Sequence, residues 1–257
     1  REDARAFNII ASPGYPELID NMVSLNNDRR NTAFVIGDTS MRLAATSTAI
    51  QNWASNSAAD TGNSEDALVT ADEYLGIFYP PGQTNDLSGN TIVVPASHMI
   101  LRTIARSDDQ SFPWFAPAGT RRGLVDNANA IGFINSATGE FQVDNVRESL
   151  RDTLYSNRVN PITFFNGVGL MNYGQKTRAA TTSSLDRINV ARLANYLRGQ
   201  LQATALGFVF EPNDKITRDE LKEQVEQIMN DLVAKRGIYD YLVVCDDTNN
   251  TPTRIDR

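Results

Sequence analysis

The stretch that decides the fold runs from Ile92 to Leu124 and reads IVVPASHMILRTIARSDDQSFPWFAPAGTRRGL. Its opening Ile-Val-Val predicts a short buried strand, which Pro95 ends because proline has no backbone donor for a ladder. Ser97 is expected to cap an amphipathic helix of about three turns. Two prolines then hold Trp114 and Phe115 in a stiff loop, which we expect to pack against another part of the molecule.

Length and composition place the chain among globular proteins. Its 257 residues, 41% hydrophobic and 21% charged, suit one large domain or two smaller ones. A net charge of −7 argues against a nucleic-acid-binding surface of any size. The single cysteine, Cys245, excludes an internal disulfide and suits a reducing compartment. The apolar runs are too short to span a membrane, and the first residues show no signal-peptide pattern.

Strand and helix patterns alternate before the opening stretch. Thr70 and Glu73 match a capping box, yet the aromatic run that follows favours a strand. We expect strands at residues 6–11, 32–36 and 74–79, helices at 17–26 and 41–53, and a solvated loop at 54–66. Gly37 and Asp38 are expected to stop the second strand. This β-α-β-α rhythm predicts an α/β sheet with helices on its faces.

The second half of the chain adds strands and two long helices. Asp144 is expected to cap a helix, Asp186 to open another, and Thr217 to start the last one through a capping box with Glu220. The last helix has the clearest apolar stripe. The predicted strands are 131–134, 161–165, 168–173 and 239–244, and the predicted buried side of the helix after Asp186 is Val190, Leu193, Leu197 and Leu201. A polar stretch at 176–184 predicts a domain boundary.

No set of residues has the pattern of a catalytic or metal site. His98 is the only histidine, which excludes a triad, and we expect it to pack or lie at the surface. Cys245 precedes two aspartates, which disfavour a thiolate, so a buried structural thiol is expected. The acidic pairs Asp72/Glu73, Asp108/Asp109 and Asp246/Asp247 lack the spacing of a calcium loop and are interpreted as solvated or ion-paired. The glycines Gly167, Gly169 and Gly174 fit a strand pair better than a dinucleotide fingerprint.

Two groups of residues are candidates for protein contacts. Trp114 and Phe115 fit a core role, and their proline bracket leaves an interface role open. The basic residues Arg121, Arg122, Lys176 and Arg178 are too scattered for nucleic acid but suit contacts with an acidic neighbouring subunit.

Five motifs along the chain carry a family resemblance. The opening stretch gives Val-Pro, a helix ending in Ala-Arg-x-Asp, then Trp-Phe-Ala-Pro-Ala-Gly and Arg-Gly-Leu. Later motifs are NPI at 160–162, INVARL at 188–193, FEPND at 210–214 and VVCDDTNNT at 243–251. Together they resemble, in order, the contractile tail sheath proteins of bacteriophages. The positions Ser97-His98-Met99 depart from the small, glycine-containing version of many sheaths.

The resemblance implies a fold and a function. It implies a larger α/β domain at 1–180, a mixed sheet flanked by helices with subtilisin-like topology but no catalytic triad, and a smaller, truncated α+β domain at 181–257. Subunits would stack as rings around a tail tube in the virion and contract to drive it through the host envelope. The implied partners are other sheath subunits, the tail tube protein, and the baseplate and tail terminator proteins, after assembly in the bacterial host cytoplasm. No enzymatic activity, cofactor or metal is implied.

Further expectations concern the extent of the chain. It begins at Arg1 and ends at Arg257 in a polar stretch, as a protease-resistant core would. The segment that links neighbouring subunits by strand addition would then be missing, and the chain alone is expected to be monomeric.

A giant phiKZ-like phage is one expected origin. Alternatives are the sheath of a bacterial secretion system or pyocin and, in another class, an α/β enzyme or small-ligand-binding protein. The charged side of the last helix, with Arg218 and Lys222, is expected to face the tube.

Overall fold

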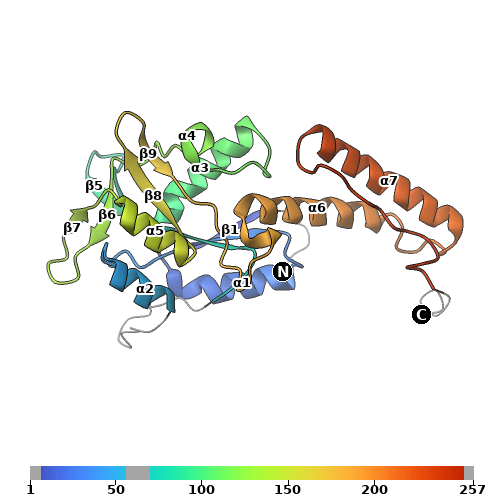
Figure 1. Ribbon diagram of the computed structural model, residues 1–257, viewed down its shortest axis with the longest axis horizontal. Coiled ribbons are helices and arrows are strands. Elements are labelled where there is room, and N and C mark those ends of the chain that lie inside the picture. Colours follow the sequence, from blue (N-terminus) through green and yellow to red (C-terminus); the bar gives the residue numbers. More distant parts are fainter. Residues whose placement is uncertain (1–6, 56–69, 252–257) are drawn as a thin grey trace. The chain divides into compact units, whose positions relative to one another are not determined.

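The computed structural model describes residues 7–55 and 70–251 (Figure 1). Two compact units divide the chain, residues 1–192 and residues 193–257, and each is described by itself. The loop predicted at 54–66 lies almost wholly outside the described residues. The predicted domain boundary at 180 stays a prediction.

A five-stranded mixed sheet forms the centre of the first unit. Its order is β1 (Ile9–Ala11), β2 (Phe34–Asp38), β3 (Leu75–Tyr79), β8 (Val159–Phe165) and β9 (Gly169–Asn172). The first four strands are parallel, and β9 is antiparallel to β8. Every residue of β2 and β3 is buried, as expected where helices cover both faces of a parallel sheet. The predicted α/β class, the aromatic strand and the hairpin at Asn166-Gly167 are confirmed.

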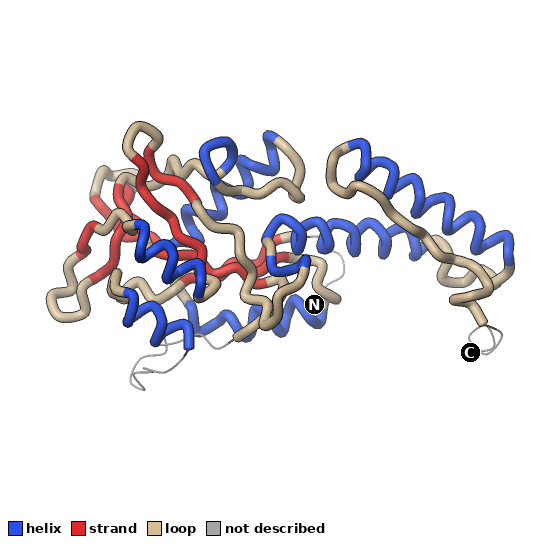
Figure 2. Tube along the Cα trace, viewed as in Figure 1, coloured by secondary structure: helices blue, strands red, loops and turns tan. Residues whose placement is uncertain are grey.

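Helices cover both sides of this sheet (Figure 2). They are α1 (Ile19–Asp28), preceded by the short 3-10 helix η1 (Pro16–Leu18), α2 (Ser47–Ser55), α3 (Ala96–Gln110) and α5 (Glu148–Ser156), with the single turn α4 (Gly119–Arg122) after α3. In Figure 2, α1 and α2 lie on one side of the strands and α3 lies on the other. The apolar face of α3, including Met99, Ile100 and Ile104, is fully buried.

A second, antiparallel sheet has the order β5 (Thr91–Val94), β4 (Gly82–Asn85), β6 (Ala130–Ile134) and β7 (Phe141–Val143). The sequence predicted β5 and β6 but missed β4 and β7, because both are short and mostly polar or exposed. The strand predicted at Ile92 to Val94 is present, but the prediction that it is buried is wrong. β5 is an edge strand, and Ile92 is 41% exposed.

Several predicted boundaries are also wrong. Gly37 and Asp38 continue β2, because Gly37 pairs with Ile77 in register and its missing side chain leaves room for the Ile77 methyl group. Helix α2 begins at Ser47 rather than at residue 41. Asp144 caps no helix: its carboxylate accepts a hydrogen bond from Val146 N at 2.7 Å, and α5 begins at Glu148.

The second unit contains most of α6 (Ile188–Leu206) and all of α7 (Lys215–Ala234). Helix α6 follows a 3-10 turn, η2 (Ser184–Asp186), and none of the four residues predicted for its buried side is fully buried. Asp214 is the N-cap of α7 and accepts from Thr217 N, so the predicted cap at Thr217 is wrong. Leu232 is the only buried hydrophobic residue of this unit among those the structure describes.

The closing strand predicted at residues 239–244 is also wrong. The described chain has no strand there, and Tyr239 and Leu242 are 103% and 86% exposed. The apolar, β-branched sequence favours a strand, but β structure forms only when another strand supplies hydrogen-bond partners.

Candidate functional site

The base of α6 is held by an ion pair that brings together two of the sequence motifs. Arg192 Nη1 lies 3.0 Å from Asp108 Oδ1, and Arg192 Nη2 lies 2.5 Å from Asp108 Oδ2. Only 2% of the Arg192 side chain and 23% of the Asp108 side chain are exposed. Asp108 ends the Ala-Arg-x-Asp motif of α3, and Arg192 belongs to the INVARL motif. A two-pronged guanidinium–carboxylate contact fixes distance and orientation at once.

The aromatic loop, residues 113–117, also contacts α6. Arg192 Nη1 also donates to Pro113 O at 3.3 Å, and Asn189 Nδ2 donates to Trp114 O at 3.4 Å. From β9, Asn172 Nδ2 donates to Pro117 O at 2.7 Å. The backbone carbonyls of the loop therefore serve as acceptors for side chains from α6 and β9. We call Asp108, residues 113–117, Asn189 and Arg192 the α6 socket.

Aromatic packing stiffens the socket. Trp114 is 6% exposed and stacks on Phe112 with ring centroids 4.8 Å apart. The guanidinium of Arg122 lies 4.9 Å from the ring centre of Phe115 and donates to Ala116 O at 3.1 Å. The predicted core role of Trp114 is therefore confirmed, and Phe115 stays partly exposed beside it.

A second polar cluster joins three segments around Asp38. The carboxylate of Asp38, 2% exposed, accepts from Ser97 N at 2.6 Å, Ser97 Oγ at 2.7 Å and Gly14 N at 2.9 Å. Burial raises the pKa of the Asp38 carboxyl above its ordinary value, and these hydrogen bonds oppose that rise. Ser97 does not cap α3 as predicted, because Pro95 is the N-cap. The carboxylate of Asp38, at the end of β2, accepts the hydrogen bond from the Ser97 amide in the first turn of the helix.

The NPI motif supplies a third buried amide. Asn160 is fully buried, and its Nδ2 donates to Ile77 O at 2.9 Å and to Lys176 O at 2.8 Å. Its Oδ1 accepts from Lys176 N at 2.6 Å. The amide thereby joins β8 to β3 and to the chain after β9, and every polar atom of the side chain is used.

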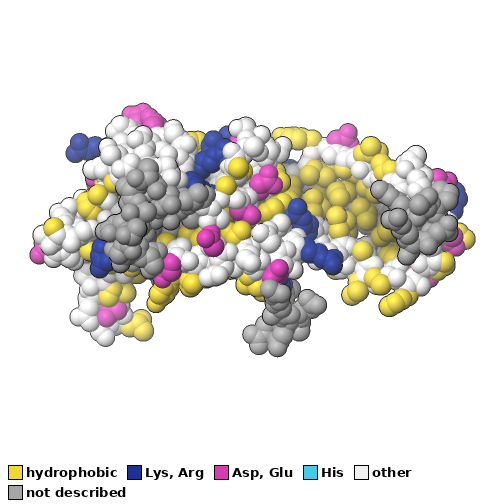
Figure 3. All heavy atoms as spheres, turned by 90° about the horizontal axis from the view of Figure 1, so that it is seen from below, with side chains coloured by type: hydrophobic (Ala, Val, Ile, Leu, Met, Phe, Trp, Pro, Cys, Tyr) yellow, Lys and Arg dark blue, Asp and Glu magenta, His cyan; other side chains and the backbone are white. Residues whose placement is uncertain are grey.

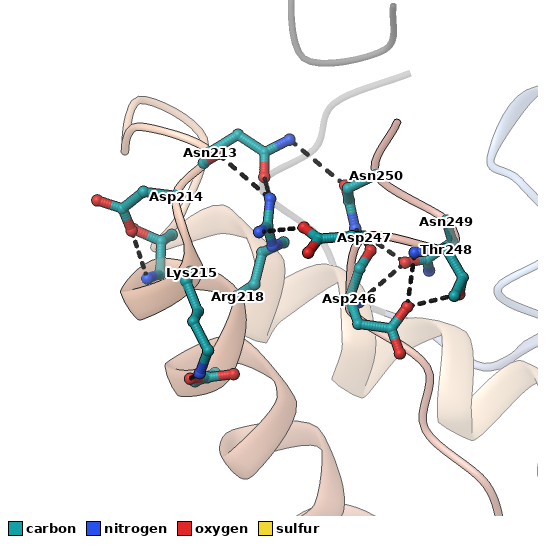
Figure 4. A network of polar contacts seen from close by, with 11 residues as sticks. Asn213, Asp214, Lys215, Arg218, Asp246, Asp247, Thr248, Asn249 and Asn250 are labelled. Atoms are coloured by element: carbon teal, nitrogen blue, oxygen red, sulfur yellow. Dashed lines mark hydrogen bonds and ion pairs between the residues drawn. The ribbon is translucent and has the colours of Figure 1, made fainter. Parts of the chain in front are cut away.

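A polar network in the second unit attaches the segment 246–250 to the start of α7 (Figure 4). Arg218 Nη2 lies 2.7 Å from Asp247 Oδ1, and Arg218 Nη1 lies 3.3 Å from Asn213 Oδ1. Asn213 Nδ2 donates to Asn250 Oδ1 at 3.4 Å. The FEPND and VVCDDTNNT motifs therefore meet, and we call this network the α7 clasp.

The segment 246–250 is folded by its own side chains. Asp246 Oδ1 accepts from Thr248 N at 2.9 Å, and Asn249 Oδ1 accepts from Asp246 N at 3.0 Å. Asn249 Nδ2 donates to Val244 O at 2.7 Å. The Thr248 hydroxyl and backbone amide, which both donate to Asp246 Oδ1, hold the pKa of the Asp246 carboxyl below its ordinary value. Local Asx hydrogen bonds of this kind explain why the motif is rich in Asp, Thr and Asn.

The remaining residues weighed from the sequence take structural positions. His98 lies in the first turn of α3 with an exposed side chain, and Cys245 is partly exposed rather than buried. Asp72 accepts from Tyr74 N at 2.6 Å, and burial raises the pKa of the Asp72 carboxyl. No group of three or more acidic, histidine or cysteine side chains in the described ranges is placed to hold a metal ion. Gly167, in the turn of the β8–β9 hairpin, and Gly169, the first residue of β9, have positive φ.

The predicted set of basic contact residues needs a correction. Arg178 is 9% exposed and donates to Asn157 O at 2.8 Å, so it is not available to a neighbouring subunit. Burial lowers the pKa of Arg178. Lys176 lies 5.0 Å from the ring centre of Tyr155, and Arg121 is exposed. In the view of Figure 3, acidic and basic side chains are interspersed among hydrophobic ones.

Sequence reasoning missed the two most buried charged residues of these clusters, Asp38 and Arg192. Both stand next to apolar residues, where a charged residue is rare unless it is paired. That position was the available signal: Asp38 is the last residue of the buried strand β2, and Arg192 lies on the inner side of α6. Their partners, 59 and 84 residues away in sequence, are given only by the fold.

Comparisons with known proteins point to one family. Residues 180–257 match the model of the phage tail sheath C-terminal domain. The chain is 37% identical over 164 residues to the tail sheath proteins of Vibrio phage KVP40 and of Enterobacteria phage T4. Each match covers 64% of this chain and 23% of the relative, so the chain spans about a quarter of the length of the curated relatives it matches.

Solved structures share the fold. The helical sheath of the anti-feeding prophage in its contracted state superposes with a TM-score of 0.65 at 18% identity, covering 89% of this chain and 55% of that one. The PVC sheath complex of an extracellular contractile injection system, also contracted, gives a TM-score of 0.65 at 19% identity over 94% of this chain and 59% of that one.

The α6 socket, the Asp38 cluster and the α7 clasp each hold segments of the chain together through side-chain hydrogen bonds and ion pairs. No helix in the described part of the chain is long and apolar enough to cross a membrane. Over 164 residues the chain is homologous to phage tail sheath proteins, and its residues 180–257 match the C-terminal domain of that family.

Proposed function

We propose that this chain is part of a structural subunit of a contractile phage tail sheath. Such subunits polymerise as stacked rings around the tail tube and contract to drive the tube through the host envelope. The observation that carries the proposal is 37% identity over 164 residues to the T4 tail sheath protein. Contraction needs no active site, because the energy lies in an extended assembly that is metastable relative to a contracted one.

The proposed partners follow from this role. They are other sheath subunits, the tail tube protein, and the baseplate and tail terminator proteins, in a virion tail assembled in the host cytoplasm. The relatives that share the fold are described as helical sheaths and as baseplates, which supports a subunit that contacts its own copies. A phage origin is favoured over a secretion system or pyocin, because the phage proteins are 37% identical and the injection-system sheaths 18 to 19%.

Finer features of the proposal rest on the resemblance. A subtilisin-like topology at 1–180 is supported by the four parallel strands β1, β2, β3 and β8 with helices on both sides. A C-terminal sheath domain at 181–257 is supported by the family match at 180–257. A phiKZ-like origin stays a prediction without support from the relatives named above. The role of an α/β enzyme or small-ligand-binding protein has no observation in its favour.

The tube-facing role expected of Arg218 and Lys222 is less favoured by the contacts of α7. Arg218 is bound to Asp247, and Lys222 Nζ lies 3.9 Å from Glu226 Oε1. Both cations are therefore compensated within the unit. An inner surface that contacts the tube would need charges that remain available.

Sedimentation velocity tests the proposed function. The complete sheath protein is expected to sediment as large polymers, whereas the 257-residue chain, which spans about a quarter of the length of its curated relatives, is expected to sediment as a monomer. Stable rings or tubes from the 257-residue chain would contradict the second expectation. A complete protein that stays monomeric under all conditions of salt and concentration would contradict the first.

A further inference from the structure

The turn that joins β8 to β9 holds the only Asn-Gly pair of the sequence, Asn166-Gly167. The loop projects beyond the sheet in Figure 1, and both residues are exposed. Val168 N donates to Phe165 O at 3.1 Å and closes the turn, and Gly167, its third residue, has a φ of 80°. A residue with a side chain is disfavoured at this φ, so the turn itself requires the glycine that follows Asn166.

Two groups that can react with each other are accessible in this turn, the side-chain amide of Asn166 and the backbone N–H of Gly167. Within the described ranges of the chain, neither group takes part in a hydrogen bond. A side-chain carbon placed at Gly167 would have no atom within 4 Å. The Gly167 nitrogen is therefore accessible to water, and no side chain of its own hinders its approach to the Asn166 carboxamide.

We propose that Asn166 is a site of spontaneous deamidation in the folded protein and that the turn accumulates isoaspartate. Hydroxide removes the Gly167 amide proton, and the Gly167 nitrogen then forms a bond to Asn166 Cγ. The bond from Cγ to Nδ2 breaks, and Nδ2 takes up a proton from water and leaves as ammonia. The product is a cyclic succinimide. A water molecule then adds to one of its two carbonyl carbons and opens the ring, and no atom is oxidised or reduced.

The carbonyl that water attacks decides the product. Attack at Asn166 Cγ breaks the new bond and gives aspartate. Attack at the backbone carbonyl carbon of Asn166 breaks the original peptide bond and gives isoaspartate, in which the main chain runs through Cβ and Cγ. Isoaspartate thus lengthens the backbone of the turn by one carbon and adds a carboxylate at an exposed position.

Hydrogen bonds on the far edge of β9 hold this strand when the turn changes. Val125 N donates to Leu170 O at 2.9 Å, and Asn172 N donates to Gly123 O at 2.7 Å. These bonds do not pass through the turn, so we expect the modified chain to stay folded and the product to accumulate.

The experiment follows the tryptic peptide 159–176 by mass spectrometry while the folded 257-residue chain is held at mildly alkaline pH. Isoaspartate is detected by enzymatic methylation with a protein isoaspartyl methyltransferase. Conversion at Asn166 should rise with pH, because the Gly167 amide must lose its proton. Its rate should lie within about tenfold of the rate in the urea-unfolded chain, since the turn restricts the approach of the two groups. Asn160 in the same peptide precedes Pro161, which has no N–H, and should stay unchanged.

The variant N166Q should remove the isoaspartate signal of this peptide, because glutamine would have to form a larger ring. Asn135 is the internal comparison: it precedes Ser136, and its Oδ1 accepts from Ala137 N at 2.8 Å. Conversion at Asn135 should be at least about tenfold slower, because its amide is held and its neighbour has a side chain.

Three results would overturn the proposal. The first is an unchanged Asn166 in the folded chain under conditions in which the unfolded chain converts, because the turn would then protect the pair. The second is aspartate without isoaspartate, which would exclude the succinimide. The third is equal conversion at Asn135, which would show that the turn does not select the site. None of these results depends on sheath assembly, which sedimentation tests separately.

Discussion

Arg192 and Asp108, 84 residues apart in sequence, lie against each other through two contacts of 3.0 Å and 2.5 Å. The pair attaches the fifth residue of α6 to the end of α3 and to the carbonyl of Pro113. The next residue, Leu193, begins the second compact unit. The ion pair thus attaches the last residue of the first unit to α3 and to the aromatic loop.

Removing Asp108 is expected to destabilise the first unit strongly. In D108A the Arg192 guanidinium stays buried without a carboxylate, which should cost about 3 to 5 kcal/mol of the free energy of unfolding. In R192M the loss should be about 1 to 3 kcal/mol, because Asp108 is 23% exposed and regains water. Urea unfolding measures both. D109A, at the exposed neighbouring position, should change little, and an equal loss in D109A and D108A would contradict the account.

Truncating Trp114 should disrupt the aromatic loop. W114A removes a ring that is 6% exposed, so the expected cost is about 3 to 5 kcal/mol. F112A removes its stacking partner, which is 37% exposed, and should cost about 1 kcal/mol. Thermal or urea unfolding of the two variants gives the comparison. A larger loss in F112A than in W114A would show that the loop is not held by its tryptophan.

Asp38 predicts a particular dependence of stability on pH. Its folded pKa is raised by burial, so its contribution to stability is fully present below the unfolded pKa and is lost as pH rises through the folded pKa. D38N has no carboxyl at this position and therefore lacks this pH dependence. The free energy of unfolding of the wild type should exceed that of D38N most at acid pH, and the difference should shrink toward neutral pH. Urea midpoints at a series of pH values test this. A gap that widens with pH would mean that the hydrogen bonds from Gly14 and Ser97 outweigh burial.

Mutation of the two candidate N-caps of α7 distinguishes the observed cap, Asp214, from the predicted one, Thr217. D214A should speed amide hydrogen exchange at Thr217 and Arg218, because Asp214 Oδ1 accepts from Thr217 N at 2.9 Å. T217A keeps that acceptor and should change exchange much less. The hydrogen bond also lowers the pKa of the Asp214 carboxyl, so its capping is present above the unfolded pKa and lost as pH falls through the folded one. Equal effects of D214A and T217A would support the capping box predicted from sequence.

The elements that periodicity defines well were predictable from the sequence. The buried runs of β2 and β3, the hairpin of β8 and β9, and the long helices α3 and α7 all follow from local patterns of apolar residues and turn signals. The predicted element boundaries were wrong where residues distant in sequence form hydrogen bonds that local patterns do not show. The sequence predicts Ser97 as a helix cap, but its backbone amide and its hydroxyl both donate to the carboxylate of Asp38.

The candidate sites were less predictable, for a physical reason. A motif shows which residues stand close in sequence, whereas the α6 socket joins side chains of α3 and α6 to backbone carbonyls of the aromatic loop. Residues 239–244 show the opposite case: their local preference for a strand is strong, but no strand in the described chain pairs with them.

Electron microscopy of the complete sheath protein, expressed without other tail components, tests the central claim most directly. Our account predicts hollow helical tubes in which each subunit contains the fold of residues 1–192, with α3 and α6 joined at Arg192 and Asp108. Particles that remain monomeric or form small closed oligomers, at every salt and protein concentration tried, would contradict it.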